Sequence, residues 1–124
     1  MEAPVLPGPR EGAGMKTQAL PQMTEKELSK QIVAAAKECG WLTYHTFLSK
    51  WSKPGFPDLC MVRNGRLLFW ELKSAVGKVS EPQAEWLEAL SAVPGVDARV
   101  VRPGDLEEVY LLLIGSSLES VYST

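Results

Sequence analysis

The feature that most constrains this chain is an Asn64-Gly65 dipeptide between two apolar runs. Asn-Gly favours a two-residue type I′ turn, because that turn needs positive φ at both central positions. A tight turn makes Arg63 face Arg66, so partners across the hairpin have residue numbers that sum to 129. The sequence therefore predicts a β-hairpin in which Asp58 lies directly opposite Glu71.

The open end of this hairpin gathers charged side chains. Directly opposed residues have Cβ atoms about 5 Å apart, and Lys73 shares a face with Glu71 because side chains in a strand alternate with a period of two. Two facing carboxylates repel each other, so a positive group is expected between Asp58 and Glu71. A divalent cation that prefers oxygen ligands, Mg²⁺ or Mn²⁺, is the obvious candidate, with Lys73 beside it.

Length and composition indicate one soluble domain, because 124 residues with 45% apolar and 23% charged side chains can build a real core. The net charge of −2 is unevenly distributed. Residues 45–80 hold six Lys or Arg against two acids, whereas eight acids face two Arg from residue 81 onwards. A basic segment around the hairpin suits a phosphate-bearing substrate, although solvated loop and strand ends explain it equally well.

Two cysteines without a signal peptide do not indicate a disulfide framework, so Cys39 and Cys60 are expected to be buried thiols in a reducing compartment. No apolar run approaches the roughly 20 residues that cross a bilayer. We therefore expect a cytoplasmic protein without membrane association.

The remaining elements follow from caps and periodicity. Residues 1–22 are rich in Pro and Gly and predict a disordered or loosely ordered tail. The sequence then predicts a helix capped by Thr24, a strand over 41–47, the hairpin, a helix capped by Ser80, a strand over 97–102 and a helix capped by Asp105. The ordered domain is expected to span residues 23–115 and to be followed by a serine-rich tail over 116–124. The predicted order is α-β-β-β-α-β-α.

Two acids in the first turn of the first helix differ in the face they occupy. Glu25 lies three residues before Leu28 and so shares the apolar face, whereas Glu27 completes a capping box with Thr24 and lies on another face. Glu25 is thus the acid that could reach a site at this helix end. An acid favoured there only by the helix dipole is an equally good explanation.

The connection after the first strand carries Lys50, Trp51 and Lys53, and it follows His45, the only histidine. With Lys78 they are candidate DNA-binding residues. Trp51 could stack on a base, or it could simply pack on the domain, and a lone histidine is more often structural than catalytic.

Several motifs together resemble a known family. Pro57-Asp58 followed by Glu71-Leu72-Lys73 resembles the PD-(D/E)XK signature of the restriction-endonuclease-like superfamily. The flanking motifs are similar to the VRR-NUC (virus-type replication-repair nuclease) family in its compact stand-alone form: Gly40-Trp41, Tyr44-His45, Gly55-Phe56-Pro57-Asp58-Leu59, Gly65-Arg66, and Ser80 to Gln83 with Trp86. The resemblance covers roughly residues 24–109. It implies a mixed β-sheet flanked by helices.

The resemblance also implies roles. Asp58 and Glu71 would bind the metal with the carbonyl of Leu72, an acid of the first helix (Glu25) would complete the site, and Lys73 would position the attacking water. Gln83 corresponds to a glutamine near the family's site, but it fits a capping box with Ser80 equally well, and both roles would require a side chain that is free to turn.

For function, the resemblance implies a Mg²⁺-dependent endodeoxyribonuclease acting on branched or double-stranded DNA in repair or recombination. Stand-alone members resemble homodimeric Holliday junction resolvases of phages and bacteria, and the last helix, with Leu111, Leu112 and Ile114, is a candidate dimer interface. Such a protein would act in the cytoplasm of a bacterial or phage-infected cell. Two alternatives stay open: a nuclease module that is active only with a partner helicase or recombinase, and a catalytically silent DNA-binding module.

Overall fold

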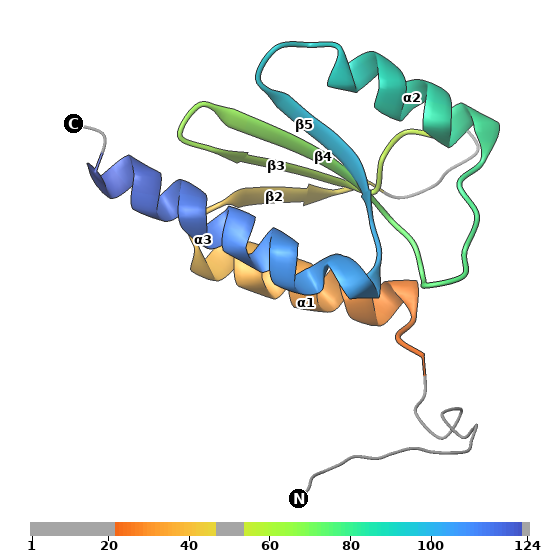
Figure 1. The fold of residues 1–124 in the computed structure, drawn as a ribbon, viewed down its shortest axis with the longest axis horizontal. Coiled ribbons are helices and arrows are strands. Elements are labelled where there is room, and N and C mark those ends of the chain that lie inside the picture. Colours follow the sequence, from red (N-terminus) through yellow and green to blue (C-terminus); the bar gives the residue numbers. More distant parts are fainter. Residues whose placement is uncertain (1–21, 47–53, 123–124) are drawn as a thin grey trace, which may run out of the picture.

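The computed structural model describes residues 22–46 and 54–122, with side chains up to residue 115. The elements follow the predicted order: α1 (Glu25–Glu38), β2 (Leu42–His45), β3 (Leu59–Arg63), β4 (Arg66–Leu72), α2 (Glu81–Ser91), β5 (Val96–Val101), the short 3-10 helix η3 (Pro103–Asp105) and α3 (Leu106–Tyr122). They form three layers, with α1 and α3 together on one side of the sheet and α2 on the other (Figure 1).

The hairpin of β3 and β4 has the predicted turn and register. Asn64 and Gly65 have φ values of 51° and 77°, as a type I′ turn requires. The pairing runs from Arg63↔Arg66 to Leu59↔Trp70 with a constant sum of 129, so no bulge shifts it. β2 pairs antiparallel with β3 and β5 pairs parallel with β4, which gives the sheet order β2-β3-β4-β5. The expected mixed sheet is confirmed.

The core fills the space between the sheet and the pair of α1 and α3. The apolar stripe predicted for α1 is confirmed, because Leu28, Ile32 and Ala36 are buried. From the sheet and α3 the buried cluster adds Trp41, Leu59, Met61, Leu68, Trp70, Leu72, Val101, Val109 and Leu113. The members on β3 and β4 alternate with residues of the opposite face, as strand geometry requires.

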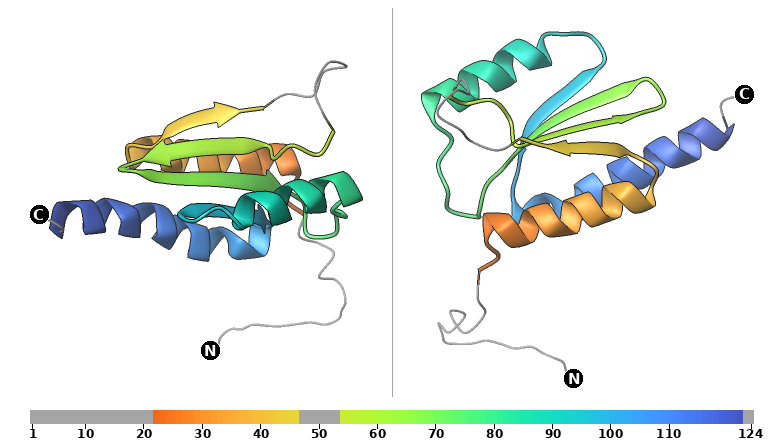
Figure 2. Two further views of the ribbon diagram at one scale, coloured as in Figure 1. Left: turned by 90° about the horizontal axis from the view of Figure 1, so that it is seen from above. Right: turned by 180° about the vertical axis from the view of Figure 1, so that it is seen from behind.

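The opposite face of the sheet is covered by α2 over β4 and β5 (Figure 2). Phe56, which precedes β3, contacts Phe69 of β4 and Trp86 of α2 edge to face. Gly55 allows the chain to approach α2 closely: its φ is +96°, and a Cβ there would lie 2.5 Å from the carbonyl carbon of Pro82. The segment before β3 is therefore packed tightly on the first turn of α2.

Local signals explain the helix ends. Thr24 and Ser80 form complete capping boxes with Glu27 and Gln83, as predicted. Gly40 follows α1 with a φ of +86°, the left-handed conformation that commonly ends a helix.

Some predictions differ from the structure. α3 continues to Tyr122 instead of ending at Gly115. A glycine inside a helix costs only about 1 kcal/mol, and the following residues include Leu118 and Glu119, which are good helix formers. The strand predicted over 41–47 is shorter, because β2 ends at His45.

The environments of three apolar side chains also differ from expectation. Cys39 and Cys60 are free but only half-buried, because Cys39 lies at the margin of the core and Cys60 lies on the face of β3 opposite to the core residues Leu59 and Met61. Leu112 packs against the core instead of facing outward, while Leu111 and Ile114 are exposed. The predicted tail over 1–22 lies outside the described residues except for its last position.

Candidate active site

The predicted cluster lies at the open end of the hairpin. The N-terminal ends of α1 and α2 lie on the same side of the molecule as the carboxyl end of β4 (Figure 1). Helix N-termini carry partial positive charge, so carboxylates are favoured near them. This sheet end brings together Asp58, Glu71, Lys73, Gln83 and Glu25.

Asp58 directly precedes Leu59, the first paired residue of β3, and it is held in place by β2 and β4. The backbone N–H of Thr46 donates to the Asp58 carbonyl at 2.8 Å, and the Thr46 hydroxyl donates to the Pro57 carbonyl at 2.8 Å. The Asp58 side chain reaches across to β4, where Oδ2 accepts a 2.8 Å hydrogen bond from the Leu72 N–H. The carboxylate therefore lies against the end of β4, although Asp58 is outside the paired ladder.

Glu71 is the buried acid of the site, with a side chain only 3% exposed. Oε2 accepts a 2.9 Å hydrogen bond from Gln83 Nε2 and lies 3.7 Å from Lys73 Nζ. Burial, reinforced by the charge of Asp58, raises the pKa of Glu71 to about 7, against the opposing effect of Lys73. Glu71 Oε1 is buried and has no hydrogen-bond partner among the described residues.

Gln83 performs both of the roles that the sequence left open. Its Oε1 accepts a 2.9 Å hydrogen bond from the Ser80 N–H, which completes the capping box. At the same time its Nε2 donates to Glu71. The expectation that the two roles require a turning side chain is wrong, because the two ends of one amide serve them together.

The structure separates the two acids of the first turn of α1. Glu27 Oε1 accepts a 3.0 Å hydrogen bond from the Thr24 N–H and is committed to the cap. Glu25 is turned toward the site, and a Cβ placed on Gly77 would lie 3.5 Å from its Oε2. The charge of Glu25 also contributes to the raised pKa of Glu71, after burial and Asp58.

A hollow of about 500 Å³ opens beside the acids on the α1 side of the sheet. Its lining consists of Glu25, Asp58, Leu72, His45, Lys26, Ser29 and Lys30. His45, one of the candidate DNA-binding residues, thus lies at this hollow. Lys26 and Lys30 were not predicted, although the helical spacing of 26, 29 and 30 places them on one face together with Ser29.

Other basic residues lie elsewhere. Arg63 and Arg66 flank the turn at the far end of the hairpin. Since a strand rises about 3.3 Å per residue, Arg66 is roughly 17 Å from Glu71 along β4. Lys78 is exposed on the segment between β4 and α2, whereas Lys50, Trp51 and Lys53 lie outside the described residues.

The donor set fits a hard divalent cation. Asp58 and Glu71 supply carboxylate oxygens, and the partnerless Glu71 Oε1 is a buried acceptor that a cation would satisfy. Among the described residues, however, no three His, Cys, Asp or Glu side chains come together as ligands of one ion. Glu25 therefore lies beside the pair of acids without forming a three-carboxylate group with them.

Comparison with known proteins supports the fold. No protein-family model matches the sequence, and the search of curated proteins found no match. A solved structure of a VRR_NUC domain protein matches with a TM-score of 0.53 and 23% sequence identity, over 75% of this chain and 92% of that chain. The chain therefore has the fold of a VRR_NUC domain protein, which confirms the restriction-endonuclease-like architecture predicted from the motifs.

Proposed function

We propose that this chain is a nuclease domain that hydrolyses phosphodiester bonds of DNA with Mg²⁺ or Mn²⁺. The observation that carries the proposal is the meeting of Asp58, Glu71 and Lys73 at one end of the sheet, where the buried Glu71 Oε1 has no described partner. A buried acid whose pKa is raised by a neighbouring carboxylate is costly unless a ligand uses it.

Each residue has a role in this proposal. Asp58, Glu71 and the Leu72 carbonyl hold the cation, which when bound neutralises phosphate charge and lowers the pKa of water. Lys73 provides a fixed positive charge where the transition state gains negative charge, and it orients the attacking water. Gln83 holds the Glu71 carboxylate through Oε2 and so leaves Oε1 to face the ligand.

The hollow on the α1 side suits the DNA backbone. Lys26, Lys30 and His45 line it together with Asp58, and lysine side chains are common phosphate contacts. Glu25 also lines it and would act through water or through Lys73, since the Cδ of Lys73 and Glu25 Oε2 both lie within 3.5 Å of the same point over Gly77.

The finer proposal is a structure-specific endonuclease for branched DNA that acts as a homodimeric Holliday junction resolvase. A substrate with two-fold symmetry calls for an enzyme with two-fold symmetry, because the two cuts must be placed symmetrically. Leu111 and Ile114 on α3 are 64% and 46% exposed and could form the interface. Leu111→Arg should convert a dimer to monomers in light scattering; a dimer that persists would exclude this surface.

The test is a cleavage panel of labelled four-way junctions, flaps, splayed arms and linear duplex in Mg²⁺, Mn²⁺ or EDTA. Asp58→Asn, Glu71→Gln and Lys73→Met should each lower the cleavage rate by at least about 100-fold, the scale of a lost transition-state contact. Glu25→Gln and Glu27→Gln form a matched pair: only Glu25→Gln should slow cleavage, because glutamine at position 27 preserves the capping box.

Three results would contradict the proposal or one of its parts. Equal cleavage by wild type and Asp58→Asn would exclude this site. Binding of branched DNA without carboxylate-dependent Mg²⁺ uptake in calorimetry would favour the silent DNA-binding module. Cleavage that appears only when a helicase or recombinase is added would favour the partner-dependent module.

A further inference from the structure

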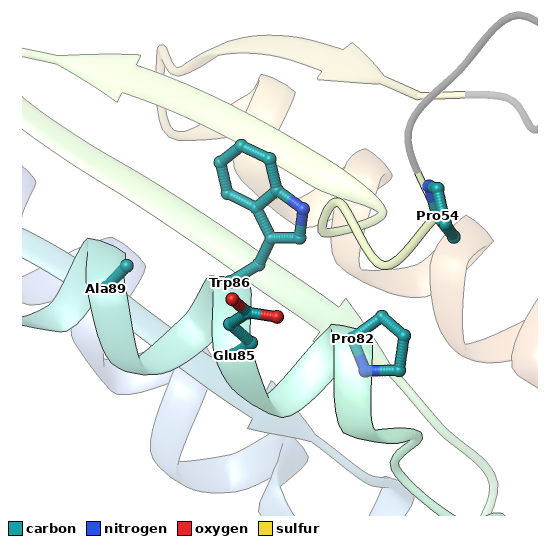
Figure 3. Close-up of a pocket in the computed structure, with 5 residues that line it drawn as sticks. All are labelled: Pro54, Pro82, Glu85, Trp86 and Ala89. Atoms are coloured by element: carbon teal, nitrogen blue, oxygen red, sulfur yellow. The ribbon is translucent and has the colours of Figure 1, made fainter.

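A second hollow, of about 450 Å³, lies along α2 on the other side of the acids. Pro82, Glu85, Trp86 and Ala89 line it from one face of the helix, and Pro54 closes it from the segment that leads to β3 (Figure 3). Its size falls within the range of about 300–1,000 Å³ of small-molecule sites. The functions assigned above use none of these residues.

The indole of Trp86 is held rigidly beside this hollow. Phe56 packs edge to face against Trp86, with ring centroids 5.0 Å apart and planes at 81°. Phe56 in turn contacts Phe69 of β4 at 5.7 Å and 79°. Trp86 is thus ordered by packing, yet it remains half-exposed and lines the hollow, which are the properties of an aromatic platform.

The hollow is close to the proposed chemistry. Trp86 follows Gln83 by three residues on α2, which is about 4.5 Å along the helix axis. Gln83 contacts the carboxylate of Glu71 directly. The separation of Gln83 and Trp86 along the helix axis is smaller than two base steps of about 3.4 Å each. A nucleotide next to the cleaved bond could therefore reach the hollow.

Charge decides which part of a nucleotide fits. Glu85 lines the hollow, and Glu81 and Glu88 are exposed on the same helix without a basic residue in α2. Among the described residues that line this hollow, Glu85 is the one charged side chain and it would repel a phosphate, whereas the hollow on the α1 side offers Lys26 and Lys30. The two hollows therefore differ in the ligand chemistry they favour, with the phosphate on the α1 side and an uncharged group on the α2 side.

We propose that the hollow along α2 binds an unpaired nucleobase of the substrate strand next to the cleaved phosphodiester, and this inference rests on the proposed function. The base stacks on Trp86, and the Glu85 carboxylate accepts a hydrogen bond from its exocyclic amino group. Cytosine and adenine offer such a group and thymine does not. The site thus selects for a base that has left the duplex, as occurs at a branch, and favours amino-bearing bases.

Binding can be measured without cleavage. In EDTA, the indole N–H signal of Trp86, assigned by its loss in Trp86→Phe, is followed by ¹⁵N NMR during titration with single-stranded tetranucleotides. We expect the deoxycytidine tetranucleotide to shift this signal at lower concentration than the deoxythymidine one. An abasic tetranucleotide, which keeps the phosphates, should leave it unmoved.

Variants test the two contacts separately. Ala89→Leu fills the hollow without removing any packing and should weaken binding of the deoxycytidine tetranucleotide by about fivefold or more, the effect of losing one stacked base. Glu85→Gln should reduce the preference for deoxycytidine over deoxythymidine. Glu88→Gln, an exposed neighbour on the same helix that does not line the hollow, should change neither quantity.

Three outcomes would overturn the inference. The first is an equal shift of the Trp86 signal with the abasic tetranucleotide, and the second is unchanged binding of the deoxycytidine tetranucleotide by Ala89→Leu. The third is a Trp86 signal that moves with protein concentration alone, because this would mean that a second copy of the chain covers the hollow. The inference can fail while the nuclease stands, if branched DNA is cleaved at wild-type rate by Ala89→Leu. Conversely, a base-dependent shift of the Trp86 signal together with no cleavage of any DNA in the panel would contradict the proposed nuclease function but not the base-binding site.

Discussion

Replacing Glu71 by glutamine should make the fold more stable at alkaline pH in the absence of metal, while it abolishes cleavage. The pKa of Glu71 is raised from 4.5 to about 7 because the side chain is buried beside Asp58. The folded protein therefore holds this proton more tightly than the unfolded chain. The contribution of Glu71 to stability is fully present below pH 4.5 and is lost as pH rises through about 7.

The size of the effect follows from the shift. At about 1.4 kcal/mol per pKa unit, wild type should lose about 3 kcal/mol relative to Glu71→Gln between pH 4.5 and pH 8. The glutamine carbonyl can still accept the hydrogen bond that Gln83 donates to Glu71. Groups that do not contact Glu71 are the same in both proteins, so the difference between the two curves reports position 71 together with the charges that interact with it, Asp58, Lys73 and Glu25.

Urea unfolding followed by tryptophan fluorescence in EDTA measures this difference. With typical urea dependences of unfolding, the midpoint of Glu71→Gln should exceed that of wild type by about 1–3 M at pH 8 and by little at pH 4.5. Glu88→Gln, exposed on α2, is the matched control and should follow wild type. Saturating Mg²⁺ at pH 8 should stabilise wild type and leave Glu71→Gln unchanged. A difference that is constant across pH would refute the reasoning.

Two further substitutions test how the site is supported. Gly55→Ala should destabilise the fold by several kcal/mol in thermal unfolding, because the φ of Gly55 is +96° and an added Cβ would lie 2.5 Å from the Pro82 backbone. Gly65→Ala is the control and should cost only about 1 kcal/mol, since Gly65 has a φ of +77° and an added Cβ would have no atom within 4 Å. Equal costs of the two substitutions would contradict the close approach of Gly55 to α2. Arg102→Ala should loosen the segment after Lys73, because Arg102 Nη1 donates to the carbonyls of Ser74 and Gly77 at 2.7 and 2.8 Å. We expect faster amide exchange over residues 74–78 and a lower cleavage rate. Unchanged amide exchange would show that these two hydrogen bonds do not hold the segment.

The hairpin was predictable because its determinants are local. Asn64-Gly65 sets the turn, and strand alternation then fixes the register as far as Leu59↔Trp70. The direct opposition of Asp58 and Glu71 was not fully predictable, since the paired ladder ends one residue before Asp58. The Asp58 carbonyl accepts from Thr46 on the β2 side of β3, and it is the Asp58 side chain that contacts β4, through the Leu72 N–H.

The charged surroundings of the site were less predictable. Arg63 and Arg66 are close to the acids in sequence but lie at the opposite end of the hairpin, a consequence of the same turn that was predicted correctly. Lys26 and Lys30 are distant in sequence and become part of the site only because α1 packs with its first turn at the sheet end. Net charge over a sequence window therefore included Arg63 and Arg66, which lie far from the acids, and missed Lys26 and Lys30, which helical spacing on α1 could have indicated.

Gln83 provides the last and most specific prediction, because one amide joins the helix cap to the active-site acid. Its Oε1 accepts from the Ser80 N–H, and its Nε2 donates to Glu71 Oε2. Gln83→Glu keeps an acceptor for Ser80 and thus the cap, but it places a second carboxylate against Glu71. Gln83→Ala removes both contacts and should cost about 1 kcal/mol through the cap.

Opposite effects on stability and activity separate these two roles. Gln83→Glu should raise the pKa of Glu71 further, since a like charge disfavours ionisation, so the rise of cleavage with pH should shift to higher pH while the helical circular dichroism is retained. Gln83→Ala should lower the melting temperature but shift the pH profile less, because it adds no charge. If Gln83→Glu instead leaves the pH profile unchanged, the amide serves only to cap α2, and the hydrogen bond to Glu71 is not part of the mechanism.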